Sequence, residues 1–186
     1  EALDRAADDL NMPHAVQTVV GDVRSAADAE RIIDAVMQRY GRLDVLINNA
    51  GVIVSAPFGS TSDEDFQESL AVHFWGVLHM SRAALEVLPH PGGRIVNICS
   101  IGGRIAVPHL AAYCAGKFAQ AGLSSVMAEE LRQEGVTVST VYPGLMRTGS
   151  YVNAKFKGQV SREYEAFAMA SSLPVLSMGA ERAARQ

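Results

Sequence analysis

Short apolar runs and longer amphipathic segments alternate along this chain, and the alternation predicts strands separated by helices. The apolar runs predict four strands, at residues 15–20, 43–47, 94–99 and 136–141. The segments between and after them predict helices at residues 25–40, 61–88, 110–134 and 161–171, with another beginning at 179. Parallel strands need crossover connections of roughly a dozen residues. This order therefore predicts right-handed βαβ units and a parallel sheet.

Two of these elements are more apolar than an element buried on only one face needs to be. The run at residues 43–47 (LDVLI) predicts a strand that is buried on both faces. The middle of the 61–88 helix, with Phe74, Trp75 and Val77, leaves little polar surface and predicts burial on all sides. The sheet, the neighbouring helices or another subunit can supply that cover.

Composition and charge narrow the class of protein. The 186 residues suit a single domain over 1–186, and the net charge of −4 argues against nucleic acid or an anionic membrane as the main partner. No run of 18 apolar residues is present, so no bilayer-spanning segment is predicted. Cys99 and Cys114 form no CxxC pair, which favours reduced thiols in a cytoplasmic protein. No metal site is predicted, because no metal-ligand spacing is found around His14, His79, His90 and His109.

Residues that can carry chemistry follow the ends of the predicted strands. Asp22, residues 48–51 (NNAG), Ser100 and residues 143–148 each come directly after a strand. Ligands bind beyond the carboxyl ends of parallel strands, so these residues are expected along one edge of the sheet.

A phenol and an ammonium group share one face of the helix that follows Ser100. Tyr113 and Lys117 lie four residues apart, which is about one helical turn. The loop between Ser100 and this helix contains Gly102, Gly103 and Pro108. A hydroxyl, a phenol and an ammonium are thus expected close together, and such a group can move protons.

In order and in spacing, these segments resemble the short-chain dehydrogenase/reductase family. The matching pieces are Asp22-Val23, Asn48-Asn49-Ala50-Gly51, Ser100 thirteen residues before Tyr113, Tyr113-x-x-x-Lys117, and Pro143-Gly144 with Thr148. The resemblance covers essentially the whole chain. It implies an α/β fold, a three-layer Rossmann-like doubly wound parallel sheet that is partial in this chain. It also implies hydride transfer between NAD or NADP and a small-molecule carbonyl or alcohol.

The resemblance also implies a role for each site residue. Tyr113 is the expected acid/base, and Ser100 is expected to hydrogen-bond the substrate oxygen. A free phenol has a pKa near ~10, and Lys117 is expected to lower that of Tyr113. The residues that the family would use for the cofactor are Asp22, Val23, Asn49, Ala50, Gly51, Tyr113, Lys117, Pro143, Gly144 and Thr148. Taken alone, Asp22 is equally well a turn residue, and Thr148 a helix cap.

The sequence departs from the family pattern in two places. The glycine-rich turn and the strand that discriminates NAD from NADP would lie before Glu1, and a last strand after Gln186, so the chain is expected to be the middle of a family member. The second departure is His73, which aligns with the asparagine of a Ser-Tyr-Lys-Asn tetrad. We expect His73 to be tolerated and to shift the pH profile as a proton relay. Its alternative role is that of a packed helix histidine.

The family resemblance also gives expectations about the substrate and about alternative functions. The substrate loop is expected at residues 145–178, where bulky side chains suggest either an apolar substrate or packing against the fold: Tyr151, Phe156, Tyr164, Phe167, Met169 and Leu173. The family implies a homodimer or homotetramer. A serine hydrolase is disfavoured because Ser100 lacks a GxSxG elbow. The alternative that remains is a non-catalytic, cofactor-impaired binding protein with the same fold.

Overall fold

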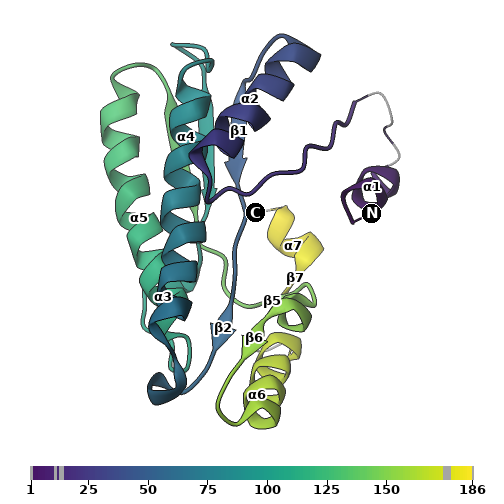
Figure 1. Cartoon of the computed structure of the whole chain (residues 1–186), viewed down its shortest axis with the longest axis vertical. Coiled ribbons are helices and arrows are strands. Elements are labelled where there is room, and N and C mark those ends of the chain that lie inside the picture. The colour runs from purple at the N-terminus through teal and green to yellow at the C-terminus, as the bar shows by residue number, and fades with distance from the viewer. Residues whose placement is uncertain (1, 11, 13–14, 174–176, 186) are drawn as a thin grey trace.

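The computed structural model describes residues 2–10, 12, 15–173 and 177–185 (Figure 1). The helices are α1 (Ala2–Asp9), α2 (Ala26–Tyr40), α3 (Asp63–Leu70), α4 (Val77–Leu85), α5 (Ala111–Arg132), α6 (Val160–Ser172) and α7 (Ala180–Ala184). The strands are β1 (Val45–Asn48), β2 (Val54–Ser55), β3 (Arg94–Ile98), β4 (Thr137–Val141), β5 (Met146–Arg147), β6 (Lys155–Phe156) and β7 (Met178–Gly179).

The main sheet is parallel, as the alternation of strands and helices predicts. Its order is β1-β3-β4, with Leu46 opposite Ile95 and Ile95 opposite Val138. Helices α2, α4 and α5 run side by side over the sheet (Figure 1). The core lies between these helices and the sheet, where Ile33, Leu46, Met80, Ala84 and Ile95 are buried together. The expectation of a Rossmann-like α/β arrangement is confirmed, and among the described residues the helices cover one face of the sheet.

Two of the strand predictions are wrong. Residues 15–20 form no strand, and Val20 is 79% exposed. A strand requires a main-chain partner, and among the described residues none pairs with this segment. In β1, Leu46 is buried but Ile47 is 60% exposed, so β1 is covered on one face only. An apolar run shows that a strand can be buried on both faces. Whether both faces are buried depends on the elements that pack against the strand.

The helix boundaries follow the capping residues. The Ser25 hydroxyl accepts a hydrogen bond from the N–H of Asp28 at the start of α2, and Gly41 ends that helix in the left-handed region at φ 72°. The predicted 61–88 helix is one run, in which a π-helical turn at Ala71–Gly76 joins α3 to α4. Trp75, in that turn, is 49% exposed, so the prediction of burial on all sides is wrong there.

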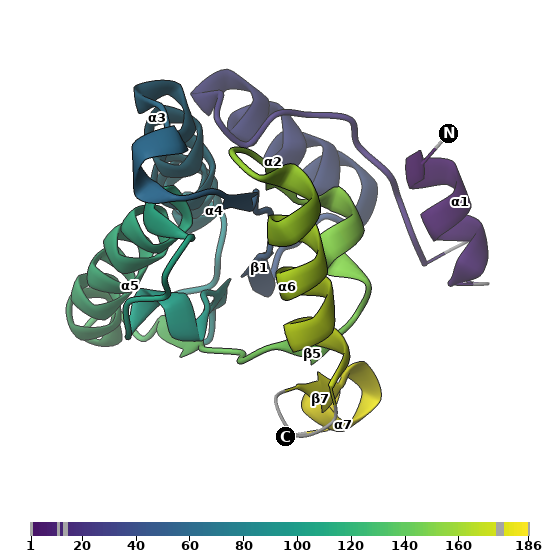
Figure 2. The same ribbon diagram turned by 90° about the horizontal axis from the view of Figure 1, so that it is seen from below.

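The segment predicted as the substrate loop crosses the carboxyl end of the sheet. Strand β6 pairs with β2, which follows β1, and β7 pairs with β5. Figure 2 looks at the molecule from this end and shows α6 in front of β1. The loop is therefore tied to the first half of the chain by a strand pair, and α6 lies over the edge where the chemistry was expected.

Candidate active site

A cavity of about 1100 Å³ opens at the carboxyl edge of the main sheet. Its walls come from the ends of β1, β3 and β4, the start of α5, and α6. Nine predicted site residues line it: Asn49, Gly51, His73, Ser100, Tyr113, Lys117, Pro143, Gly144 and Thr148. The fold thus brings together segments that are far apart in the sequence, as the strand-end rule predicts.

Ser100 directly follows β3 and caps the turn that leads away from it. Its hydroxyl accepts a hydrogen bond of 3.1 Å from the N–H of Gly102, which starts the 3-10 turn Ile101–Gly103. The N–H of Ile101 donates to the carbonyl of Pro143 at 2.9 Å, so the loop after β3 is tied to the loop after β4. These bonds hold the serine at the sheet edge, where it lines the same cavity as Tyr113.

Tyr113 lies in the first turn of α5 with its phenol in the cavity. Burial raises the pKa of the phenol, and the hydrogen bond with Ser100 acts in the opposite direction. The sequence predicted a pKa lowered by Lys117, and this prediction is wrong for this structure because desolvation of the phenolate is the larger effect. The phenol is therefore held in its protonated form, which is the form that donates a proton.

Lys117 is only 4% exposed, which is unusual for a lysine. Its ammonium donates to the carbonyl oxygen of Ile98 at 3.0 Å and to Gln120 Oε1 at 2.9 Å. The nitrogen lies 5.9 Å from the centre of the Tyr113 ring. Burial lowers the pKa of Lys117 to about 8, since the charged form has lost most of its water. Gln120 and a main-chain carbonyl thus replace that water.

His73 is fully buried in the π-helical turn, and both of its ring nitrogens are occupied. Nδ1 lies 3.1 Å from the Ser69 hydroxyl, and Nε2 accepts the N–H of Val52 at 3.3 Å. Burial and the charge of Lys117 lower the pKa of His73 to about 3. The ring therefore stays neutral near neutral pH, which argues against the proton relay expected from the sequence. The finding fits the alternative of a packed histidine.

Three of the residues expected to bind the cofactor, Asp22, Val23 and Ala50, do not line this cavity. Asp22 is 45% exposed and bound by the side chain and N–H of Arg24, and these hydrogen bonds lower its pKa to about 2. Val23 and Ala50 line a second cavity of about 170 Å³, and Asn49 lines both cavities. The expected cofactor contacts of Asp22, Val23 and Ala50 therefore stay predictions.

Asn48 has a structural role in the sheet. Its amide donates to Asn97 Oδ1 at 2.9 Å, which joins β1 to β3. The amide of Asn97 in turn donates to the Ser124 hydroxyl at 2.9 Å, which joins the sheet to α5. This buried network fixes the two strands whose ends carry Asn49 and Ser100.

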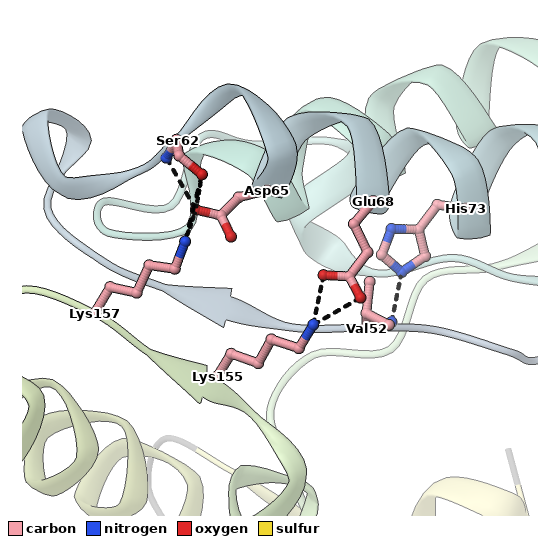
Figure 3. Close-up of polar contacts among 7 residues, drawn as sticks. All are labelled: Val52, Ser62, Asp65, Glu68, His73, Lys155 and Lys157. Atoms are coloured by element: carbon pink, nitrogen blue, oxygen red, sulfur yellow. Dashed lines mark hydrogen bonds and ion pairs between the residues drawn. The ribbon is translucent and has the colours of Figure 1, made fainter.

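Two pairs of opposite charges fasten the segment predicted as the substrate loop to α3 (Figure 3). Lys157 Nζ lies 2.6 Å from Asp65, whose carboxylate also accepts the Ser62 N–H in a capping box. Lys155 Nζ lies 2.6 Å from Glu68. Figure 3 shows Lys155 of β6 and Lys157, which directly follows β6, reaching toward α3 beside the contact between His73 and Val52. The loop is thus held next to the buried histidine.

Of the bulky residues predicted to favour an apolar substrate, Phe167 lines the cavity. Phe156 packs edge to face against Phe167 and Tyr164. Met169 is 62% exposed and Leu173 43% exposed. The side chain of Tyr151 lies outside the described residues. For most of this set the structure shows packing or exposure, the alternative weighed from the sequence.

Sequence reasoning missed four residues that shape the site: Ser55, His109, Gln120 and Glu163. Gln120 is buried against Lys117, and Glu163 binds both Ser55 and His109 across the cavity wall. Their signal in the sequence is weak, because Glu163 lies 54 residues beyond His109 and 108 beyond Ser55. An acid at the start of a predicted helix is ordinarily an N-terminal charge on the helix surface.

The remaining expectations concern groups outside this site. Cys99 and Cys114 are buried free thiols, as predicted. Among the described residues, no cluster of three or more His, Cys, Asp or Glu side chains could hold a metal ion, and His14 lies outside them. No described helix is both long and apolar enough to cross a membrane.

Comparison with known proteins supports the family resemblance. A model of the short chain dehydrogenase family matches residues 1–157. An uncharacterized oxidoreductase of Thermotoga maritima is 34% identical over 164 residues, covering 88% of this chain and 64% of that protein. A D-threitol dehydrogenase of Mycolicibacterium smegmatis is 38% identical over 128 residues, covering 68% of this chain and 49% of that protein. The chain therefore spans about half to two thirds of the length of these relatives.

A solved structure gives the same result for the fold. The short chain dehydrogenase/reductase of Burkholderia phymatum, in complex with NAD, superposes with a TM-score of 0.81 at 25% identity, covering 91% of this chain and 66% of that one. The resemblance drawn from NNAG, Ser100, Tyr113-x-x-x-Lys117 and Pro143-Gly144 is confirmed by sequence and by structure. This chain belongs to the short-chain dehydrogenase/reductase family.

Proposed function

We propose that the full-length protein is an NAD(P)-dependent oxidoreductase that interconverts a carbonyl and an alcohol, with Tyr113 as the acid/base. The observation that carries this proposal is one cavity lined by Ser100, Tyr113 and Lys117 together. This arrangement can place a substrate oxygen against two hydroxyl groups, one to stabilise developing charge and one to exchange a proton.

The cavity fits the nicotinamide half of a dinucleotide together with a substrate. Binding pockets for small ligands usually measure about 300–1,000 Å³, and this cavity reaches about 1100 Å³. A Cβ atom added at Gly144 would meet nothing within 4 Å, so the wall leaves open space at this point. We assign the nicotinamide side to Pro143, Gly144 and Thr148 and the ribose side to Asn49 and Lys117. When bound, the dinucleotide supplies the hydride acceptor or donor.

The protein's own residues then move the proton. Ser100 donates a hydrogen bond to the carbonyl oxygen, and Tyr113 transfers its phenolic proton to that oxygen as the alcohol forms. Burial favours the protonated phenol, which is the form from which this proton is transferred. The ammonium of Lys117 lies 5.9 Å from the centre of the ring, where in this proposal it opposes part of the cost of burying the phenolate.

Assembly is a separate part of the proposal. Trp75 of the π-helical turn and Phe118 and Val126 of α5 are each about half exposed, at 49%, 47% and 55%. These apolar side chains lie on the two helices that the family pairs between subunits. We propose a homodimer or homotetramer, and we place the protein in the cytoplasm because of its two free thiols.

The test is oxidation of NADH and NADPH by the purified full-length protein with a panel of aldehydes and ketones, followed by the absorbance of the reduced nicotinamide. Turnover with at least one acceptor is expected. A folded protein that binds the dinucleotide but turns over no acceptor would instead be the non-catalytic binding member of the family.

A further inference from the structure

A glutamate and a histidine form a pair in the wall of the active-site cavity. Glu163 projects from α6, and its carboxylate oxygens lie 2.8 and 2.9 Å from Nδ1 of His109, in the loop before α5. The Ser55 hydroxyl, in β2, donates to Glu163 Oε2 at 3.2 Å. The Glu163 side chain is 10% exposed and the His109 side chain 52% exposed. The carboxylate is thus the buried member and the imidazole the accessible one.

The backbone holds His109 in an unfavourable conformation to make this pair. Its φ of 66° lies in the left-handed region, which residues other than glycine seldom adopt. Its carbonyl accepts the N–H of Ala56 at 2.8 Å, so the loop is bonded to the segment that follows β2. Strain of this kind persists where surrounding contacts impose it, and it clusters at functional sites.

The pair fixes which ring nitrogen of His109 carries the proton. A carboxylate can only accept, so Nδ1 must donate to Glu163. In the neutral ring, Nε2 then keeps its lone pair and is a hydrogen-bond acceptor. Nε2 has no hydrogen-bond partner among the described residues, and the ring lines the same cavity as Tyr113. A carboxylate that orients a histidine in this way ordinarily prepares the second nitrogen for a ligand.

The neighbouring wall shows what kind of ligand group this nitrogen would select. Val107 and Leu110 flank His109 in the sequence, and with Ala166 and Phe167 of α6 they line the same cavity. An acceptor flanked by these apolar groups favours a ligand that places a hydrogen-bond donor at this point and apolar atoms beside it. A hydroxyl group meets this requirement, whereas a bare hydrocarbon would leave the nitrogen unpaired.

We propose that Nε2 of His109, oriented by Glu163, accepts a hydrogen bond from a second hydroxyl group of the substrate. This proposal deepens the proposed function and rests on it. It makes the substrate a hydroxylated ketone or aldehyde, or the corresponding diol, rather than a plain hydrocarbon carbonyl. His109 is then a specificity-determining residue, Glu163 a positioning residue, and Ser55 a support for the carboxylate.

The kinetic test compares ketones that carry one terminal hydroxyl with the ketones that have hydrogen in its place, over several chain lengths. The wild-type full-length protein is expected to prefer the hydroxyketone of one length by roughly tenfold or more in kcat/KM. His109→Phe with Glu163→Met removes the acceptor without leaving a buried carboxylate unpaired, and it should bring this ratio close to one. Glu165→Met is the matched control, because Glu165 lies exposed on α6 and is not among the residues that line the cavity, and it should keep the preference. An unchanged ratio in the double variant would overturn the proposal.

A second measurement does not depend on turnover. In protein labelled with ¹⁵N-histidine, the His109 signals, assigned by their loss in the double variant, should show a ring protonated at Nδ1 alone. Adding the hydroxyketone should shift the Nε2 signal, and adding the parent ketone should not. A ring protonated at Nε2 overturns the proposal, as does an Nε2 signal that neither ketone shifts. Failure to reduce any ketone counts against the proposed function, and the ¹⁵N result still decides whether His109 recognises the hydroxyl.

Discussion

The imidazole of His73 meets the phenol ring of Tyr113 edge to face, with 5.4 Å between the ring centres and 90° between their planes. The contact joins the π-helical turn to the start of α5. It shows how the residue at the usual asparagine position supports the proposed acid/base: it packs against the ring while both of its nitrogens bond elsewhere.

We expect Tyr113→Phe to lower kcat by roughly 10²- to 10⁴-fold, because the variant keeps the ring contact with His73 but has no proton to transfer. The measurement is NADH or NADPH oxidation with an acceptor found in the panel. Tyr40→Phe is the matched control, since Tyr40 is 41% exposed on α2 and lies outside the cavity. Activity of Tyr113→Phe within a few-fold of wild type would remove Tyr113 from this role.

His73→Asn should make the protein less sensitive to acid. The folded-state pKa of His73 is about 3 against its ordinary value of 6.5, so the unfolded chain binds more protons between these values and stability falls as the pH drops. At pH ~4 this dependence amounts to roughly 3 kcal/mol, which the variant should lack. Urea unfolding from pH ~7 to ~4 measures it.

The same variant tests the proton relay in the full-length enzyme. Since the ring stays neutral near neutral pH, we expect the pH–rate profile of His73→Asn to match that of wild type in this range. A displaced profile would restore the relay expected from the sequence.

Lys117→Met should remove a rise in stability at alkaline pH. The folded-state pKa of about 8 lies below the ordinary lysine value of 10.5, so burying the ammonium costs stability below pH 8, and the cost is relieved as the pH rises toward 10.5. The full effect corresponds to about 3 kcal/mol. Because other groups titrate in this range, the quantity to compare is the difference between wild type and variant in urea unfolding. A difference that does not vary between pH 8 and 10.5 would contradict the prediction.

Gly116→Ala should destabilise the fold by about 1–3 kcal/mol through overpacking. A Cβ atom at this position would lie 2.5 Å from the Ser69 hydroxyl and 2.8 Å from Nδ1 of His73, so α5 could not stay as close to α3 and the π-helical turn. Gly122→Ala is the matched control on the same helix. Nothing lies within 4 Å of its added Cβ, and better helix propensity should stabilise it by up to about 1 kcal/mol. Equal unfolding midpoints for the two variants would be the contrary result.

Asp65→Asn should cost about 1–3 kcal/mol, because the Asp65 side chain is 6% exposed, caps α3 and pairs with Lys157, which directly follows β6 (Figure 3). Asp63→Asn serves as the control, since Asp63 lies exposed in the same first turn. Thermal and urea unfolding compare the two. Similar losses from both would show that the helix charge, rather than the contact with Lys157, carries the effect.

Much of the fold could be predicted because its signals are local. Ser25 and Gly41 bound α2 through caps that act within one turn, and the strand-end rule placed Ser100 and Tyr113 at one edge of the sheet. The spacing of the motifs around Asn49, Ser100 and Tyr113 identified the family. Such spacing is readable from sequence because residues on one helix or in one short loop lie at a fixed distance from one another.

The sequence by itself determined the order of the elements and the groups that carry the chemistry, because apolar periodicity, caps and short motifs are set by neighbouring residues. Only the tertiary structure decided that residues 15–20 are not a strand and that Ile47 is exposed, because cover and pairing come from other elements. It also decided that burial raises the pKa of Tyr113 and that Glu163 meets His109. Desolvation and long-range contacts depend on how the whole chain packs, and no local pattern encodes them.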